Sequence, residues 1–220
     1  MILLVNTGFS PLVAGADRPV GQHLIRLLQQ QDYFYKGLSL ESRERLPATG
    51  AMPVLVLLPS MWRSDDLEHI PYWLDLAQQE DMPVLLVSSM SVYKAAVDTS
   101  YRESDDAFDN SQLAQTLLQL EPKAQENPRH LNLRKAQRFS LHGGNYASEW
   151  LKRMRSHSLL EFDMQRPFNP TPADDIAEVL LAMLKPSFCV DGLWGTYPFG
   201  RVEPVSWYAV AERTLADATP

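Results

Sequence analysis

The sequence contains almost no cysteine. Cys189 is the only one among 220 residues, which excludes a disulfide within these residues and a metal site made of several thiolates. The five histidines form no close pair on one helix face, so we expect no bound metal. A lone thiol suits a reducing compartment, and we interpret Cys189 as a small residue of the core.

Excess positive charge and long apolar runs are also missing. The net charge is −7, with 20 Lys and Arg against 27 Asp and Glu and no basic block. This balance argues against nucleic acid or an anionic membrane as a partner. No apolar run approaches the roughly 20 residues of a membrane-spanning helix. The opening residues MILLVN are too few for a signal-peptide core and lack a basic leader. We therefore expect a soluble, cytoplasmic protein.

Short apolar runs recur along the first 140 residues. Many are apolar at adjacent positions, which is typical of strands buried between two helix layers. Five such runs occur, at 11–14, 34–40, 53–58, 83–89 and 130–133. Helical patterns over 20–28 and 66–79 lie between some of them, and this alternation predicts an α/β doubly wound parallel sheet, the Rossmann fold. Residues 2–6 also have strand character; we favour 11–14 as the first strand, because a glycine turn and a helix follow it directly.

The helix predicted over 20–28 has the clearest pattern. Its apolar positions Val20, Leu24 and Leu28 fall on one face. Asp17 is placed to cap the helix, and Pro19 suits its first turn.

The pattern changes near residue 140. Beyond a Gly143-Gly144 turn, helices are expected over 146–155, 174–184 and 206–216. We predict a Rossmann-like nucleotide-binding domain over residues 1–140 and a small α-rich lobe over 141–220. The two are expected to pack as one unit.

The turn after the first strand carries two spaced glycines. The segment from Val13 to Gly21 resembles the TGxxGxxG turn of short-chain dehydrogenases, with Gly15 and Gly21 at the outer glycines and Arg18 in place of the middle one. In such turns the glycines let the backbone approach a pyrophosphate at a helix N-terminus. The resemblance implies cofactor contacts from this turn. The residues concerned are Gly15, Asp17, Arg18, Val20 and Gly21. Arg18 would either crowd the phosphates or pair with one.

Two serines end the fourth strand. Residues 87–93, Val-Ser-Ser-Met-Ser-Val-Tyr, are similar to the SSxxVYG signature of the extended short-chain dehydrogenase/reductase superfamily. The resemblance implies that the Ser89 hydroxyl bonds the substrate carbonyl and that Ser88 lies beside the cofactor.

The C-terminal third resembles one branch of that superfamily. Residues 169–177 are similar to the PTxxxDLA segment of dTDP-4-dehydrorhamnose (RmlD-like) reductases. Residues 133–146, 192–196 and 205–211 resemble further stretches of that branch, in the same order. The resemblance implies NADP or NAD as cofactor. At the adenine end, Arg43 would contact a 2′-phosphate and so favour NADP. The backbone at Leu58 and Pro59, just after the third strand, would run close to the cofactor.

The acid/base pair of this branch is missing. Its chemistry requires a Tyr with a Lys four residues later on the same helix, in the pattern YGxxKLxGE. None of the eight tyrosines has such a lysine. The residues four positions later are Gly37, Ser39, Leu76, Val97, Asp105, Trp150, Arg201 and Glu212. The best overlay puts Phe108 at the Tyr place and Gln112 at the Lys place. Its register is open by a residue or more, because the preceding loop is short.

Three hypotheses follow. The first is a degenerate RmlD-like protein, weakly active or inactive as a reductase, that binds a nucleotide, another small molecule or a protein partner, with a homodimer as one form. The regulatory β subunit of methionine adenosyltransferase is an analogy. The second is a working NAD(P)-dependent oxidoreductase on a carbonyl or sugar nucleotide, using Ser89 and an unusual acid such as Tyr93, Tyr101 or Lys94. The third is a structural or oligomeric protein that binds no nucleotide, which Arg18 and Pro59 favour.

Overall fold

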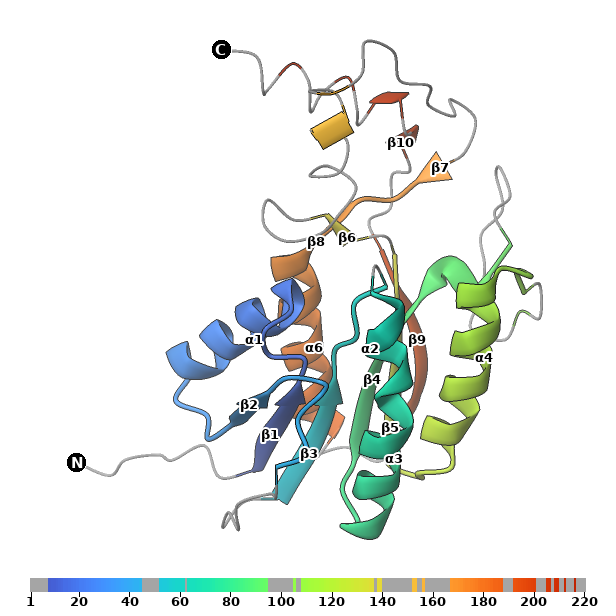
Figure 1. Cartoon of the computed structure of the whole chain (residues 1–220). Helices are drawn as coiled ribbons and strands as arrows, with labels where there is room; N and C mark the ends of the chain where they lie inside the picture. Colours follow the sequence, from blue (N-terminus) through green and yellow to red (C-terminus); the bar gives the residue numbers. More distant parts are fainter. Residues whose placement is uncertain are drawn as a thin grey trace.

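The protein is described from a computed structural model (Figure 1). The described residues are 8–44, 52–61, 63–94, 105, 108–136, 138–139, 152–153, 156, 167–187, 192–200, 205–206, 208–209, 212 and 216. The predicted helix over 146–155 lies largely outside them. Residues 2–6, the Gly143-Gly144 turn and Cys189 lie wholly outside them.

A six-stranded sheet forms the centre of the molecule. Its order is β2-β1-β3-β4-β5-β9, and every neighbouring pair is parallel. The strands are β1 (Phe9–Ala14), β2 (Lys36–Leu38), β3 (Met52–Leu57), β4 (Val84–Ser89), β5 (His130–Lys135) and β9 (Gly195–Phe199). The predicted doubly wound parallel sheet is confirmed, and 11–14 does belong to the first strand of this sheet.

Helices cover both faces of the sheet (Figure 1). One face packs against α1 (Pro19–Gln30) and α6 (Ala173–Ser187), and the other against α3 (Ile70–Gln79) and α4 (Gln112–Gln125). Alternate residues of β3 divide between the two faces: Val54 and Val56 pack toward α1 and α6, and Leu55 and Leu57 toward α3. Burial on both faces explains why these strands are nearly continuous apolar runs.

The single helix predicted over 66–79 is wrong. The chain forms α2 (Ser64–Glu68) and then α3, with His69 between them. Pro71 explains the break, because it has no N–H to continue the helical hydrogen bonds and it suits the first turn of a new helix. The break separates α2 from α3, which packs against the sheet.

The predicted cap of α1 is also wrong. Arg18 is the N-cap residue and no side chain caps the helix; the Asp17 carboxylate bonds Arg18 instead. An arginine with several carboxylates nearby competes for Asp17 more strongly than the backbone N–H groups do.

The C-terminal part adds to the central layers. Both α6 and β9 come after residue 140, and β9 pairs with β5 along the whole of its length. Short strand pairs lie beyond the carboxyl edge (Figure 1). They are β6 (Arg138–Phe139) with β8 (Thr171–Pro172), and β7 (Pro167–Phe168) with β10 (Val205–Ser206). Ser206 lies in β10, so the helix predicted over 206–216 does not begin at that residue.

The core contains a buried amide without a hydrogen-bond partner. Asn132 in β5 is fully buried, and among the described residues neither its amide nitrogen nor its amide oxygen has a hydrogen-bond partner. We expect Asn132→Leu to raise the free energy of unfolding by about 1 kcal/mol or more, because burying an unbonded amide is costly. Urea denaturation measures this change. Asn127→Leu is the contrast, because Asn127 bonds the Met82 carbonyl and the Arg129 N–H and its loss should destabilise. A destabilised Asn132→Leu protein would contradict the prediction.

Candidate functional site

The order of the described strands reverses at β1, and we call the region outside the strand ends at this point the crevice. Starting from β1, the chain places β2 on one side and β3, β4, β5 and β9 on the other. In open parallel sheets, ligands bind outside the carboxyl ends of the strands where the order reverses. Here that point lies between the turn after β1, which begins at Gly15, and the segment Leu58–Ser60 after β3. The residues that the sequence assigned to cofactor binding at these two places do come together.

The two glycines of the turn are required by the turn itself. Gly15 has a φ of +93°, and a Cβ there would lie 2.6 Å from the Leu58 carbonyl oxygen. A Cβ on Gly21 would lie 2.1 Å from the Gly15 carbonyl oxygen. Val20 beside it is buried. The spacing of the glycines therefore follows from the close approach of α1 to the strand ends.

Arg18 is held inside the crevice by carboxylates. Its Nε lies 2.9 Å from Asp66 Oδ2 and its Nη2 lies 2.6 Å from Asp66 Oδ1, a bidentate pair between residues 48 apart in sequence. Nη2 also donates to Glu41 Oε1 at 2.9 Å, and Nη1 bonds the Asp17 carboxylate. Arg18 is 7% exposed and Asp66 is fully buried. The hydrogen bond to Asp66 is the main cause that raises the pKa of Arg18.

Carboxylates outnumber cations around Arg18. Glu41 and Asp65 both have lowered pKa values; for Glu41 a backbone hydrogen bond is the main cause, and for Asp65 a hydrogen bond from Arg63. Arg63 lies within 3.6 Å of Glu41, 3.1 Å of Asp65 and 3.4 Å of Asp66. Asp17 brings the acidic side chains here to four, against two arginines.

The residues of this turn do not fit a pyrophosphate. Such a group is held by backbone N–H donors and a close glycine backbone. Here the Arg18 N–H bonds the Gly15 carbonyl at 3.0 Å, and the Ser60 N–H bonds Asp66 Oδ2 at 2.7 Å. Pro19 and Pro59 have no N–H to offer. The guanidinium of Arg18 is already matched by carboxylates, so its charge is not directed at a ligand.

Arg43 lies at the edge of the same crevice. Its Nη1 donates to the carbonyls of Leu40 at 3.1 Å and Ser42 at 2.8 Å, and its guanidinium carbon lies 4.0 Å from the centre of the Tyr72 ring. Its Nη2 is 3.2 Å from His69 Nδ1. The predicted contact with a 2′-phosphate stays a prediction.

The two serines at the end of β4 have separate partners. Ser89, 3% exposed, is the N-cap of η1 (Met90–Val92): its Oγ accepts from the Ser91 N–H at 3.1 Å and donates to Ser91 Oγ at 3.0 Å. Ser88 is fully buried and donates to Glu121 Oε1 at 2.5 Å. Ser89 lies at the carboxyl edge, where the resemblance places a substrate carbonyl, whereas the hydroxyl of Ser88 is directed at α4.

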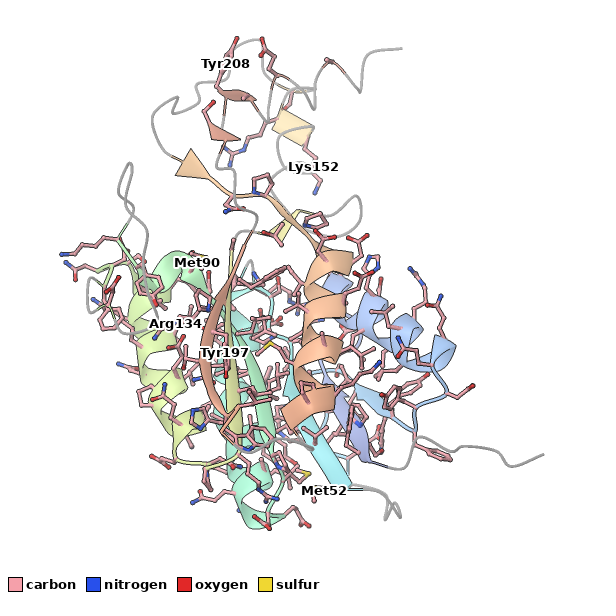
Figure 2. The ribbon with its side chains drawn as sticks, turned by 180° about the vertical axis from the view of Figure 1, so that it is seen from behind. Met52, Met90, Arg134, Lys152, Tyr197 and Tyr208 are labelled. Atoms are coloured by element: carbon pink, nitrogen blue, oxygen red, sulfur yellow. The ribbon has the colours of Figure 1, made fainter. Side chains whose placement is uncertain are left out.

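A buried ionic network joins Arg134 (labelled in Figure 2) to Glu121, the partner of Ser88. Arg134 Nη2 is 2.7 Å and Nε is 3.1 Å from Glu121 Oε2, and Arg134 Nη1 is 2.5 Å from the Tyr93 hydroxyl. Burial lowers the pKa of Arg134, but the hydrogen bond and charge of Glu121 outweigh it and the pKa is raised. The sequence contains one signal for this network, because Glu121 is an acidic residue within the otherwise apolar face of α4.

Phe108 and Gln112 do not share a helical turn. Phe108 lies before α4 and forms a bridge with Tyr93, whose ring is 6.3 Å away. Gln112 is the first residue of α4, after the N-cap Ser111. In YGxxKLxGE the Glu comes eight residues after the Tyr. If Glu121 is that Glu, Leu113 and Leu117 stand at the Tyr and Lys places.

A family model described as the RmlD substrate binding domain matches residues 74–219, from α3 to the C-terminal segment. The chain belongs to this family. The resemblance to the reductase and epimerase members of the short-chain dehydrogenase/reductase superfamily is thereby confirmed. No curated protein matches the chain in sequence.

Solved structures share the fold of this RmlD-family chain at low identity. A dTDP-4-dehydrorhamnose reductase from Clostridium acetobutylicum has a TM-score of 0.78 and 16% identity, covering 94% of this chain and 79% of that one. A Bacillus anthracis reductase in complex with NADP has a TM-score of 0.77 and 14% identity, covering 96% and 81%. MoeE5 in complex with UDP-glucuronic acid and NAD has a TM-score of 0.73 and 19% identity, covering 95% and 82%. Similar proteins therefore bind NADP or NAD and sugar nucleotides.

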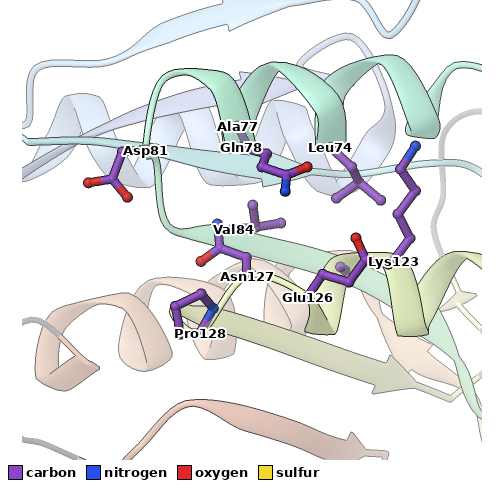
Figure 3. Close-up of a pocket in the computed structure, with 10 residues that line it drawn as sticks. Leu74, Ala77, Gln78, Asp81, Val84, Lys123, Glu126, Asn127 and Pro128 are labelled. Atoms are coloured by element: carbon purple, nitrogen blue, oxygen red, sulfur yellow. The ribbon is translucent and has the colours of Figure 1, made fainter.

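A separate hollow lies at the opposite end of the sheet (Figure 3). It has a volume of about 160 Å³ and lies between the C-terminal ends of α3 and α4, with Val84 at the amino end of β4 in its wall. It is remote from the crevice.

Among the described residues there is no group of three or more His, Cys, Asp or Glu side chains able to hold a metal ion. In the same part of the chain no helix is long and apolar enough to cross a membrane.

Proposed function

We propose that this RmlD-family protein is weakly active or inactive as a reductase and acts as a binding module. Its ligand is a nucleotide, another small molecule or a protein partner, including a second copy of the chain, held at the carboxyl edge of the sheet. Apart from α6 and β9, which belong to the central layers, residues 141–220 serve as a reduced substrate lobe packed with the rest. The main observation that supports this proposal is that no tyrosine in the sequence has a lysine four residues later.

The physical reason is proton delivery. Reduction of a carbonyl needs an acid at its oxygen, and in this family a Tyr supplies the proton while a Lys lowers its pKa. In one register Phe108 and Gln112 stand at these places, and in the other Leu113 and Leu117, the latter fully buried. A phenyl or alkyl group transfers no proton, and an amide only hydrogen-bonds. Loss of the acid alone typically lowers the rate by about 10²–10⁴-fold.

A turnover assay tests this function. The full chain is incubated with NADPH or NADH and a dTDP-4-keto sugar, then with a panel of other carbonyls, and absorbance of the nicotinamide is followed. We expect a rate at least about 10²-fold below that of an authentic RmlD-like reductase measured beside it. Nicotinamide-dependent reduction at the rate of that enzyme would refute the proposal.

A second function has one observation in its favour. The Tyr93 hydroxyl lies 2.5 Å from Arg134 Nη1, near Ser89. This pair supplies a phenol and a cation, the two groups that the family's Tyr and Lys provide, from different positions in the chain. A working oxidoreductase would use Tyr93 as its acid. Against this, Tyr93 is 5% exposed and Arg134 is already paired with Glu121. If turnover is found, Tyr93→Phe should abolish it under this alternative and leave it unchanged otherwise.

A further inference from the structure

The phosphate side of the crevice is closed by the protein itself. We propose that the Arg18–Asp66 pair occupies the place of a dinucleotide pyrophosphate, and that Arg18 thereby selects against NAD and NADP. The inference rests on the proposed function, because it limits which ligands the same crevice can bind. The bound molecule places no pyrophosphate on the turn from Gly15 to Gly21.

The pair joins the two sides of the reversal point. Arg18 follows β1, at the start of α1, whereas Asp66 lies in α2 after β3. Both guanidinium contacts to Asp66 are short, at 2.9 and 2.6 Å, and the same carboxylate accepts the Ser60 N–H. A ligand phosphate on the turn would have to displace side chains that hold the two sides together.

Burial makes that displacement unfavourable. Asp66 has no exposed surface and Arg18 has 7%. Separating such a pair removes the bidentate guanidinium from a fully buried carboxylate, and breaking a buried ion pair is strongly destabilising. A solvent-exposed arginine would swing aside at little cost, but this one is fixed by three carboxylates.

Charge acts in the same direction. Arg18 and Arg63 are the two cations of this cluster, and each lies within 4 Å of three carboxylates. The side chains of Asp17 and Glu41 remain 49% and 40% exposed at the rim. An approaching pyrophosphate therefore meets carboxylates at the surface, and like charges repel.

Restoring the glycine tests the inference. R18G/D66N returns the middle glycine of the turn, removes the pair without changing net charge, and keeps an amide oxygen for the Ser60 N–H. The control K123A/D75N removes the exposed pair between Lys123 and Asp75, 2.7 Å apart on the α3–α4 face. NADH and NADPH are titrated into each protein by calorimetry.

We expect no saturable binding of either nucleotide by the wild-type chain or the control up to about 1 mM, and at least about tenfold tighter binding by R18G/D66N. Wild-type binding in the micromolar range would overturn the inference, as would a folded R18G/D66N that binds no better than the control. Far-ultraviolet circular dichroism establishes the folding of the variants.

A measurement on the wild type keeps the test independent of the variants. Inorganic pyrophosphate is added to the labelled chain, and the amide signals of Gly15 and Gly21 are followed by NMR. We expect them not to move, and saturable shifts would overturn the inference. Nucleotide binding without turnover would sink this inference and leave the proposed function standing, whereas carbonyl turnover would sink the proposed function as well.

Discussion

Replacing Glu121 by leucine is expected to lower the free energy of unfolding by about 3–5 kcal/mol. Glu121 is 2% exposed and accepts hydrogen bonds from Arg134 and from the Ser88 hydroxyl. Its removal leaves the Arg134 guanidinium, itself 6% exposed, without its counter-charge in the interior. Denaturation in urea, followed by circular dichroism, measures the loss.

Two controls make this result specific. E121L/R134M removes both charges and should recover most of the loss, because a packed apolar pair is often as stable as a buried ion pair. Asp75→Ala breaks the exposed pair with Lys123 of the same helix as Glu121, and should lower the free energy of unfolding by less than about 1 kcal/mol. Equal losses for the Glu121 and Asp75 variants would show that burial does not decide the outcome.

Replacing Gly21 by alanine should destabilise the protein by about 3 kcal/mol or more. The new Cβ would lie 2.1 Å from the Gly15 carbonyl oxygen and 2.8 Å from Ala16 Cα. Both are backbone atoms, so no side-chain rotation can relieve the clash and α1 must move away from the strand ends. Thermal unfolding with and without the substitution measures the effect.

Gly8→Ala serves as the matched control. A Cβ on Gly8 would have no atom within 4 Å, and this exposed residue just precedes β1. Its replacement should change the free energy of unfolding by about 0.5 kcal/mol or less. A Gly21→Ala protein as stable as Gly8→Ala would mean that α1 does not pack against the turn as described.

Much of the architecture could be predicted from local pattern. The buried strands β3 and β4 are apolar on both faces, a property that neighbouring residues display in the sequence itself. The face of α1 formed by Val20, Leu24 and Leu28 is buried as its spacing predicted. The site was less predictable. Phe108 was aligned with a helical position, but α4 begins at Gln112, and short sequence patterns locate such boundaries poorly.

The partners of charged residues depend on contacts that no local pattern displays. Arg18 and Asp66 are 48 residues apart, and Arg134 and Tyr93 are 41 apart. Before the sheet order is known, any acidic residue is as good a partner for Arg18 as another. The sequence predicted that Arg18 either crowds a phosphate or pairs with one. The structure contains a third arrangement, in which Arg18 pairs with Asp66.

The amino-acid sequence by itself determined the class of fold, the glycine turn and the lack of a Tyr-Lys pair, because periodicity, turn residues and i,i+4 spacing are local properties of a chain. Only the tertiary structure decided that Arg18 is joined to Asp66 across the crevice and that Glu121 holds Arg134. Those contacts arise when β1, β3, β4 and β5 align their carboxyl ends, which brings distant side chains into a water-poor interior where each charge needs a partner.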